Sequence, residues 1–316
     1  MDLSIVIPVY NSSDGLHELY SRITKVLNSI IISYEIILVD DCSVDKSFEV
    51  MKQLNENDNR VKVIQLLRNF GQHNAIICGM NYSSGNYVIT MDDDLQNPPE
   101  EIPNLLNEIK KGYDCVIGSP AIKQHAKYRN VGSYMIGKSY EKIFAKPKHV
   151  KMSSFRILSR SLVDSIITYK SANPMIDALI LKNTRNVSNI EVKHDARKYG
   201  ESNYSLRKSY KLAMDILVNY STIPLRFISW IGFVSAVIGG LIVVYVLIGK
   251  LSGLISAAGW SSIIALISIF SGLILISFGV VGEYLIRIIG QFSYSEQYSI
   301  RSSSFEAERE QLLEKN

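Results

Sequence analysis

The chain has 316 residues, 47% of them hydrophobic, and a formal net charge of +4 at pH 7. This length accommodates about two domains of average size. The charge is mild and no basic patch or nucleic-acid motif accompanies it, so we expect attraction to an anionic membrane leaflet and no nucleic-acid partner. Cys42, Cys78 and Cys115 have no paired spacing, and we expect them to be reduced and buried as small apolar residues.

The N-terminal part of the chain alternates apolar, strand-like runs with segments whose apolar residues recur at helical spacing. We expect strands over residues 3–7, 34–39, 61–67, 87–91 and 115–118. We expect helices between them, the first capped by Ser12 or Ser13, the second opened by Asp45 and the third over residues 75–82. This alternation predicts an α/β fold with a mostly parallel sheet and helices on both faces.

Polar or charged residues follow several of these strands, and they would meet at one edge of the sheet. The residues are Pro8-Val9-Tyr10-Asn11, Asp40-Asp41, Arg68, and Asp92-Asp93-Asp94. Ligands of open α/β sheets bind beyond the carboxyl ends of the strands. Acids at the first two ends can accept hydrogen bonds from a base and a ribose, and the other two supply charge for a diphosphate and its metal. Neither GxGxxG nor a P-loop is present, so the sequence predicts a nucleotide site without the Rossmann cofactor signature.

The acidic triplet Asp92-Asp93-Asp94 joins the apolar run at residues 87–91 to Pro98-Pro99. Adjacent carboxylates repel one another and resist burial unless a cation lies among them. Mg²⁺ usually takes one or two carboxylates together with phosphate oxygens. The alternative interpretation is a solvated acidic turn before a helix that starts near Pro98, and the three acids alone do not decide between the two.

Two long segments in the C-terminal part are free of charge: residues 227–249, and the stretch after Lys250 up to Glu283. Each reaches the roughly 20 residues that cross a bilayer as a helix. Basic residues flank the outer ends of this pair, so the positive-inside rule places both termini in the cytoplasm. We therefore expect a cytoplasmic catalytic domain (1–205), a juxtamembrane amphipathic helix (206–224), two spans (about 227–249 and 261–286, within 225–289) and a cytoplasmic tail (290–316).

A family resemblance rests on motifs along nearly the whole chain. IVIPVYN, EIILVDDCSVD, LLRNFGQHNA and ITMDDDLQNPPE resemble family 2 glycosyltransferases with the GT-A fold. VKHDARKYGESNYS, STIPLR and GVVGEYLIRI are similar to polyprenyl-phosphate glycosyltransferases of the dolichol-phosphate mannosyltransferase and bactoprenol glucosyltransferase type. Each motif is weak by itself, but their order and spacing are specific. The resemblance implies a GT-A domain followed by a juxtamembrane helix and a two-helix transmembrane hairpin.

The same resemblance implies inverting transfer of a hexose from an NDP-sugar, with UDP-glucose as the leading candidate, to a polyprenyl phosphate. A bacterial inner membrane with undecaprenyl phosphate is implied in the same way, and the product would serve modification of cell-envelope glycans. Because a phosphate monoester is already anionic, with a second pKa of about 6, the acceptor needs no general base. The sequence leaves homo-oligomer formation open.

The resemblance also assigns site residues by motif. Asp92, Asp94 and Gln96 would hold Mg²⁺ or Mn²⁺, which stabilises the departing nucleoside diphosphate. Asp94 and Arg197 are the expected catalytic residues, and Arg197 would clamp the acceptor phosphate with its bidentate guanidinium. The nucleotide-sugar would contact Pro8, Tyr10, Asp40, Asp41, Arg68, Asp92 and Asp93. The acceptor phosphate would contact Arg197, Ser202 and Tyr204, with Arg129 and Arg156 as second choices.

The chain departs from the family at two places, and two other functions compete. Ser119 follows Gly118 where the family often has an arginine, and Ser153-Ser154 stand where many members carry an aspartate proposed as a base. A processive polysaccharide synthase would carry QxxRW, but neither Trp230 nor Trp260 follows an arginine. A catalytically silent membrane scaffold is the other alternative, against which the intact DDDLQ and RKYGES motifs argue.

Overall fold

The computed structural model describes residues 1–30, 32–120, 146–147, 150–171, 174–195, 259–292 and 297–305, with isolated residues between 227 and 252. The chain divides into two compact units. Met1–Ser205 and Ser295–Asn316 form the first unit, and Leu206–Tyr294 form the second. The predicted juxtamembrane helix at residues 206–224 lies outside the described residues.

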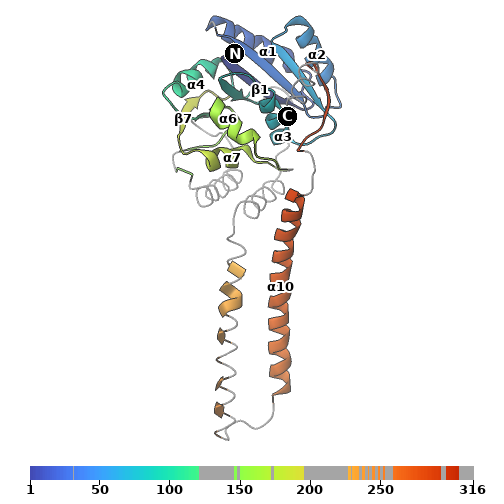
Figure 1. Cartoon of the computed structure of the whole chain (residues 1–316), viewed down its shortest axis with the longest axis vertical. Coiled ribbons are helices and arrows are strands. Elements are labelled where there is room, and N and C mark those ends of the chain that lie inside the picture. The colour runs from blue at the N-terminus through green and yellow to red at the C-terminus, as the bar shows by residue number, and fades with distance from the viewer. Residues whose placement is uncertain are drawn as a thin grey trace. The chain divides into compact units, whose positions relative to one another are not determined.

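The first unit contains a mixed sheet flanked by helices (Figure 1). The sheet has eight described strands in the order β7-β5-β6-β4-β1-β2-β3-β8. The strands are β1 (Leu3–Val9), β2 (Tyr34–Asp40), β3 (Val61–Leu66), β4 (Tyr87–Thr90), β5 (Cys115–Pro120), β6 (Arg156–Ser159), β7 (Val187–Val192) and β8 (Ile300–Ser303). Parallel pairing joins β1 to β2 and β4, β2 to β3, and β5 to β7. All five predicted strands are present. The sheet is mixed because two strands that the sequence did not predict, β6 and β8, run against their neighbours.

Helices cover both faces of this sheet. They are α1 (Leu16–Ser29), α2 (Ser47–Asn57), α3 (Gln72–Asn81), the 3-10 helix η1 (Pro99–Glu101), α4 (Ile102–Ile109), α6 (Arg160–Ile167) and α7 (Ile176–Asn183). One buried cluster joins α1, α2 and α4 to the sheet, and a second joins α3, α6 and α7. Because successive side chains of a strand point to opposite faces, Ile5 and Ile7 enter the first cluster and Val6 enters the second.

The starts of α1 and α2 differ from those predicted from the sequence, and hydrogen bonds connect the two. Gly15 is the N-cap of α1, so the prediction that Ser12 or Ser13 caps this helix is wrong. The backbone N–H groups of these serines instead donate to Ser47 Oγ at 2.8 Å and to Asp45 Oδ2 at 3.1 Å. Asp45 also accepts the Ser47 N–H at 3.0 Å, but the N-cap of α2 is Lys46, one residue later than the predicted start at Asp45. These contacts tie the end of β1 to the start of α2.

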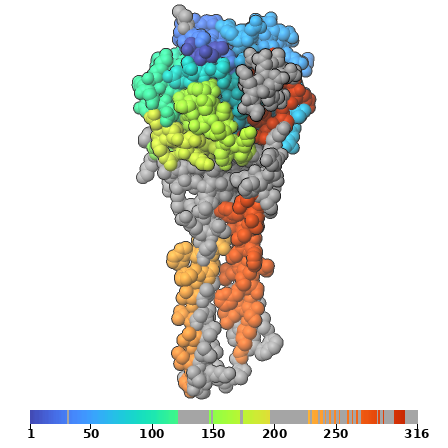
Figure 2. Space-filling view, viewed as in Figure 1, coloured from blue at the N-terminus to red at the C-terminus, as the bar shows by residue number. Residues whose placement is uncertain are grey.

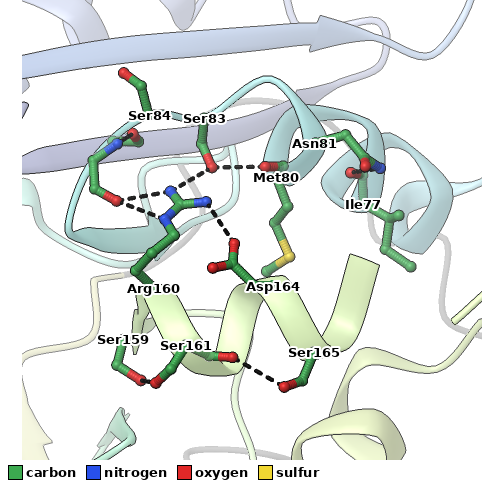
Figure 3. Close-up of polar contacts among 12 residues, drawn as sticks. Ile77, Met80, Asn81, Ser83, Ser84, Ser159, Arg160, Ser161, Asp164 and Ser165 are labelled. Atoms are coloured by element: carbon green, nitrogen blue, oxygen red, sulfur yellow. Dashed lines mark hydrogen bonds and ion pairs between the residues drawn. The ribbon is translucent and has the colours of Figure 1, made fainter. Parts of the chain in front are cut away.

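Arg160, the first residue of α6, fixes the turn that precedes β4 (Figure 3). Its Nε and Nη2 atoms donate to the Gly85 carbonyl oxygen at 2.9 and 2.7 Å, and Nη2 also donates to Ser83 Oγ at 3.0 Å. Gly85 has no room for a side chain, because a Cβ there would lie 2.5 Å from the Ser4 backbone nitrogen. The start of β4 is therefore held firmly, and its other end carries the acidic triplet.

The chain returns to the first unit at its C-terminal end. β8 pairs antiparallel with β3, and backbone bonds of 2.8 Å (Leu67 N to Ser299 O) and 2.9 Å (Ser304 N to Val63 O) flank the pairing. The Phe305 ring lies 5.0 Å from the Tyr82 ring on the end of α3. Figure 2 shows this segment, in red, on the surface beside the light-blue part of the unit. Residues 297–305, which the sequence analysis assigned to a tail, thus complete the sheet.

The second unit contains α10 (Trp260–Phe292), which covers the apolar segment predicted as the second span. Among the residues that the structure describes, no helix combines the length and the apolar character required to cross a bilayer. The two predicted spans therefore stay predictions.

Candidate active site

The carboxyl ends of β1, β2, β3 and β4 meet at one edge of the sheet, because these neighbouring strands run parallel. Among the described residues, three that are not glycine have a positive φ, and each follows one of these strands. They are Asn11 (53°), Cys42 (62°) and Leu95 (58°). Such backbone conformations cost on the order of 1–3 kcal/mol and cluster at functional sites. Their position marks this edge as the candidate site.

Asp92 is held by the side chains of Gln72 and Ser154, neither of which was predicted to act in the site. Its Oδ1 accepts a hydrogen bond from Gln72 Nε2, and its Oδ2 accepts one from Ser154 Oγ, both at 2.6 Å. The Ser154 carbonyl oxygen accepts a further bond of 2.7 Å from Thr90 Oγ1, at the end of β4. The first acid of the triplet is therefore oriented from two sides.

Asp93 and Asp94 complete the concentration of negative charge. Burial raises the pKa of Asp93 to about 6, and the charges of Asp92 and Asp94 act in the same direction. The Asp93 Oδ2 atom accepts the Tyr10 N–H at 3.3 Å, which brings the end of β1 to the triplet. Asp94 Oδ1 accepts the N–H of Gln96 at 3.1 Å. The loop after β4 carries the three predicted metal-site residues, Asp92, Asp94 and Gln96, and the bond to Asp93 places this loop beside Tyr10.

Asp40 and Asp41 shape the loops at this edge. Asp41 is buried and accepts the N–H groups of Phe70 and Gly71 at 2.7 and 2.9 Å. Its burial raises its pKa, and these two bonds oppose that effect. Asp40 is also buried, and it accepts the Ser43 N–H at 3.0 Å and Gln65 Nε2 at 3.1 Å. Both carboxylates thus have structural partners, and their direct contact with a nucleotide stays a prediction.

The other residues predicted to bind the nucleotide-sugar differ in exposure. Pro8 is buried within β1, whereas Tyr10 is 44% exposed just beyond that strand. Arg68 is exposed after β3, and its guanidinium carbon lies 4.7 Å from the centre of the Phe70 ring. Tyr10 and Arg68 therefore present an aromatic ring and a cation to solvent at the same edge.

The residues predicted for the acceptor are only partly described. Arg156 is 2% exposed, and its Nη1 lies 2.5 Å from Asp177 Oδ1 in α7, so this arginine is engaged in a buried ion pair. The other predicted acceptor residues, Arg129, Arg197, Ser202 and Tyr204, lie outside the described residues. The segment before Arg197 does reach the site, because the Asp195 N–H donates to the Gln96 carbonyl oxygen at 2.9 Å.

The ligands at this site suit a metal ion that is bound jointly by the protein and a phosphate group better than one bound by protein side chains alone. In the described parts of the chain, no group of three or more His, Cys, Asp or Glu side chains could hold a metal ion. A cation at Asp92 and Asp94 would instead take one or two carboxylates and complete its shell with phosphate oxygens, as Mg²⁺ usually does. Burial is the main cause of the raised pKa of Asp93, and the charges of Asp92 and Asp94 add to it; a cation would offset that repulsion.

Comparison with known proteins identifies the family. The profile of Glycosyl transferase family 2 matches residues 4–167, just over half of the chain. The chain belongs to glycosyl transferase family 2. This family 2 chain is a glycosyltransferase, as the resemblance of its motifs predicted.

Relatives match this family 2 chain over nearly its full length. An undecaprenyl-phosphate 4-deoxy-4-formamido-L-arabinose transferase of Proteus mirabilis (strain HI4320) is 36% identical over 302 residues, which is 95% of this chain and 93% of that protein. The uncharacterized glycosyltransferase YkcC of Bacillus subtilis (strain 168) is 33% identical over 304 residues, with coverages of 95% and 93%.

Solved structures support the fold. Glucosyl-3-phosphoglycerate synthase of Mycobacterium tuberculosis in complex with UDP matches with a TM-score of 0.53 at 16% identity, over 69% of this chain and 78% of that one. A second crystal structure of that synthase, with a TM-score of 0.50 at 16% identity over 69% of this chain and 77% of that one, holds Mn²⁺ and UDP-glucose. The predicted GT-A-type α/β fold is thereby confirmed for the first unit.

Proposed function

We propose that this glycosyltransferase moves a sugar from a nucleoside diphosphate donor to a polyprenyl phosphate at the cytoplasmic face of the cell membrane. The hydrogen bond from the Asp195 N–H to the Gln96 carbonyl oxygen carries this proposal. It joins the segment that leads into the RKYGES motif to the loop that bears the acidic triplet. Asp195, two residues before that motif, thus lies against the loop whose carboxylates are expected to hold the donor. The names of the full-length relatives support a lipid phosphate as the acceptor.

On the donor side, we assign the nucleoside to the ends of β1 and β2, next to Tyr10, and the diphosphate to the acidic loop near Arg68. Asp92, Asp94 and Gln96 would hold Mg²⁺ or Mn²⁺. When bound there, the ion neutralises charge on the departing nucleoside diphosphate. The clustering of Asp92, Asp93 and Asp94 at a strand end supports this assignment, because burial, and to a smaller extent the charges of Asp92 and Asp94, raise the pKa of Asp93.

On the acceptor side, the nucleophile is a phosphate oxygen. It is anionic near neutral pH, since the second pKa of a phosphate monoester is about 6. Attack at the anomeric carbon, opposite the departing diphosphate, forms the new bond to phosphate and inverts the configuration. The Ser154 hydroxyl donates a hydrogen bond to Asp92, so we do not assign Ser154 as a general base for the acceptor. Arg197 is proposed to clamp the acceptor phosphate with its bidentate guanidinium.

The membrane part of the proposal rests on the sequence. Two spans and a surface helix at residues 206–224 would hold the catalytic unit at the height of a lipid phosphate. UDP-glucose is the first donor to test. UDP-4-deoxy-4-formamido-L-arabinose is the second, because the relatives are named for that sugar.

The test is transfer of label into lipid. Membranes that contain the full-length chain are incubated with undecaprenyl phosphate, Mn²⁺ and a panel of labelled UDP-sugars and GDP-mannose. We expect label from one donor in the solvent-extractable lipid, no label with excess chelator, and none with Asp94→Ala. Arg197→Ala should keep donor binding and lose acceptor use.

Two outcomes would contradict the proposal. Label in an insoluble polymer, with none in lipid, would indicate a processive synthase. An absence of transfer from every donor, together with an absence of metal-dependent nucleotide binding, would indicate a silent scaffold.

A further inference from the structure

We propose that Gln72 and Ser154 are positioning residues, which orient the Asp92 carboxylate toward a divalent cation and the donor diphosphate. This inference rests on the proposed function, because it assigns how the donor site is kept in shape. Its basis is the pair of hydrogen bonds of 2.6 Å, one on each oxygen of Asp92.

The two donors reach Asp92 from separate elements. Gln72 is the first residue of α3, and Ser154 lies two residues before β6. One bond to each oxygen fixes the rotation of the carboxylate about its Cβ–Cγ bond. A carboxylate offers about four acceptor positions. The two bonds use one of these positions on each oxygen and so set the plane of the carboxylate.

The chemistry of the donors suits a cation site. An amide N–H₂ and a hydroxyl are neutral, so they hold the carboxylate without cancelling its charge, whereas lysine or arginine would cancel it in part. Arg68, four residues before Gln72, lies over the Phe70 ring, and Arg156, two residues after Ser154, pairs with Asp177. Gln72 and Ser154 thus orient Asp92 without themselves adding a positive charge beside it.

The backbone around both donors is itself anchored. Asp41 accepts the Phe70 and Gly71 N–H groups, and Gly71, with φ of 90°, is the N-cap of the helix that Gln72 begins. On the other side, Thr90 Oγ1 holds the Ser154 carbonyl oxygen, and Thr90 is fully buried. Asp41, predicted to bind the nucleotide, thereby also supports the position of Gln72. Each donor is placed independently of its bond to Asp92.

The test measures metal binding directly. Purified full-length protein in detergent is titrated with Mn²⁺ in the presence of UDP, with GDP in a parallel series, and free Mn²⁺ is followed by electron paramagnetic resonance. Loss of a partner of a metal ligand typically weakens metal affinity about 10- to 100-fold. We expect Ser154→Ala and Gln72→Ala each to raise the Mn²⁺ Kd about tenfold, with kcat at saturating Mn²⁺ changed less than about threefold.

Two further variants separate positioning from a general structural effect. Ser153→Ala removes the neighbouring hydroxyl, which accepts the Phe155 N–H at 3.3 Å, and should leave the Mn²⁺ Kd unchanged. Ser154→Thr keeps a hydroxyl and should restore binding close to wild type. The thermal midpoint of Ser154→Ala should match wild type within about 2 °C, because the bond from Thr90 goes to the backbone and survives the substitution.

The inference is overturned if Ser154→Ala and Gln72→Ala bind Mn²⁺ as tightly as wild type. It is equally overturned if they lose kcat while the Mn²⁺ Kd stays constant. If wild-type protein itself shows no nucleotide-dependent Mn²⁺ binding, the donor site of the proposed function fails, and the positioning role fails with it. The wild-type titration therefore distinguishes the two failures.

Discussion

Replacing Asp177 by alanine should destabilise the first unit strongly, because it leaves the Arg156 guanidinium buried without its carboxylate. The exposed fraction of Arg156 is 2%, and its Nε atom has no hydrogen-bond partner among the described residues. Removing one member of a buried ion pair costs about 3–5 kcal/mol. The Asp177 side chain is 23% exposed, so water can partly solvate the guanidinium, and we expect the lower end, about 3 kcal/mol.

The chain offers a matched control in Asp164→Ala. Arg160 and Asp164 form an ion pair of 3.4 Å, but Asp164 is 57% exposed (Figure 3). Exposed pairs contribute about 0–1 kcal/mol. For a unit of this size, 3 kcal/mol lowers the thermal midpoint by about 6–12 °C, whereas the control should lower it by less than about 4 °C. Dye-monitored thermal unfolding of the full-length protein in detergent measures both shifts.

Equal shifts for the two variants would refute the reasoning, since burial would then make no difference. The experiment also bears on the predicted contact of Arg156 with the acceptor. If Asp177→Ala leaves the midpoint unchanged and alters only the KM for polyprenyl phosphate, Arg156 serves the acceptor and not the fold.

Three further predictions follow from burial and backbone geometry. Burial alone would raise the pKa of Glu35, but bonds from Lys62, Ser4 and Ser84 outweigh it and leave the pKa lowered. The stability from Glu35 is therefore present above its unfolded pKa of about 4.3 and is lost as pH falls through the lower folded value. Urea midpoints should fall more between pH 5 and pH 3 for wild type than for Glu35→Gln, and parallel curves would contradict this. A Cβ at Gly71 would meet no atom within 4 Å, but alanine there must hold a φ of 90°. Gly71→Ala should therefore lower the free energy of unfolding by about 1–3 kcal/mol, measured by thermal unfolding. It should also weaken Mn²⁺ binding by displacing Gln72, measured by the Mn²⁺ titration. Burial raises the pKa of Cys115 to about 12, so peptide mass spectrometry should find it unalkylated by iodoacetamide at pH 8 unless the protein is denatured.

The sequence predicted the strands whose segments are mainly apolar. β1 and β2 are buried along their whole length and lie between two layers of helices, so each is apolar except for Ser4 in β1 and for Glu35 and the terminal Asp40 in β2. The missed strands lack that signal. β6 has four residues and includes Arg156. β7 carries polar residues and is the last of the described strands on its side of the sheet, and β8 pairs with a strand more than 200 positions away. Pairing at that separation leaves no local pattern.

The residues of the candidate site that lie close together in the sequence could be predicted, and those that only the fold brings together could not. The Asp92 triplet directly follows a buried strand, and its position at a strand end can be read from neighbouring residues. Gln72 and Ser154 lie 20 and 62 positions from Asp92, and only the fold brings them together. The sequence also could not show that the Asp41 carboxylate accepts hydrogen bonds from the Phe70 and Gly71 N–H groups. In the sequence, an acidic residue that follows a strand gives the same signal whether its carboxylate contacts a ligand or the backbone of a loop.

The return of the chain at β8 limits how the catalytic unit can be produced by itself. A fragment that stops at Ser205 would lack the segment that pairs with β3 and covers Tyr82. It would expose the unpaired N–H and C=O groups of β3, and such an open edge promotes aggregation. A version without the second unit should instead keep both Met1–Ser205 and Ser295–Asn316, joined by a flexible linker. Such an internal deletion keeps both stretches that fold together and removes only what lies between them.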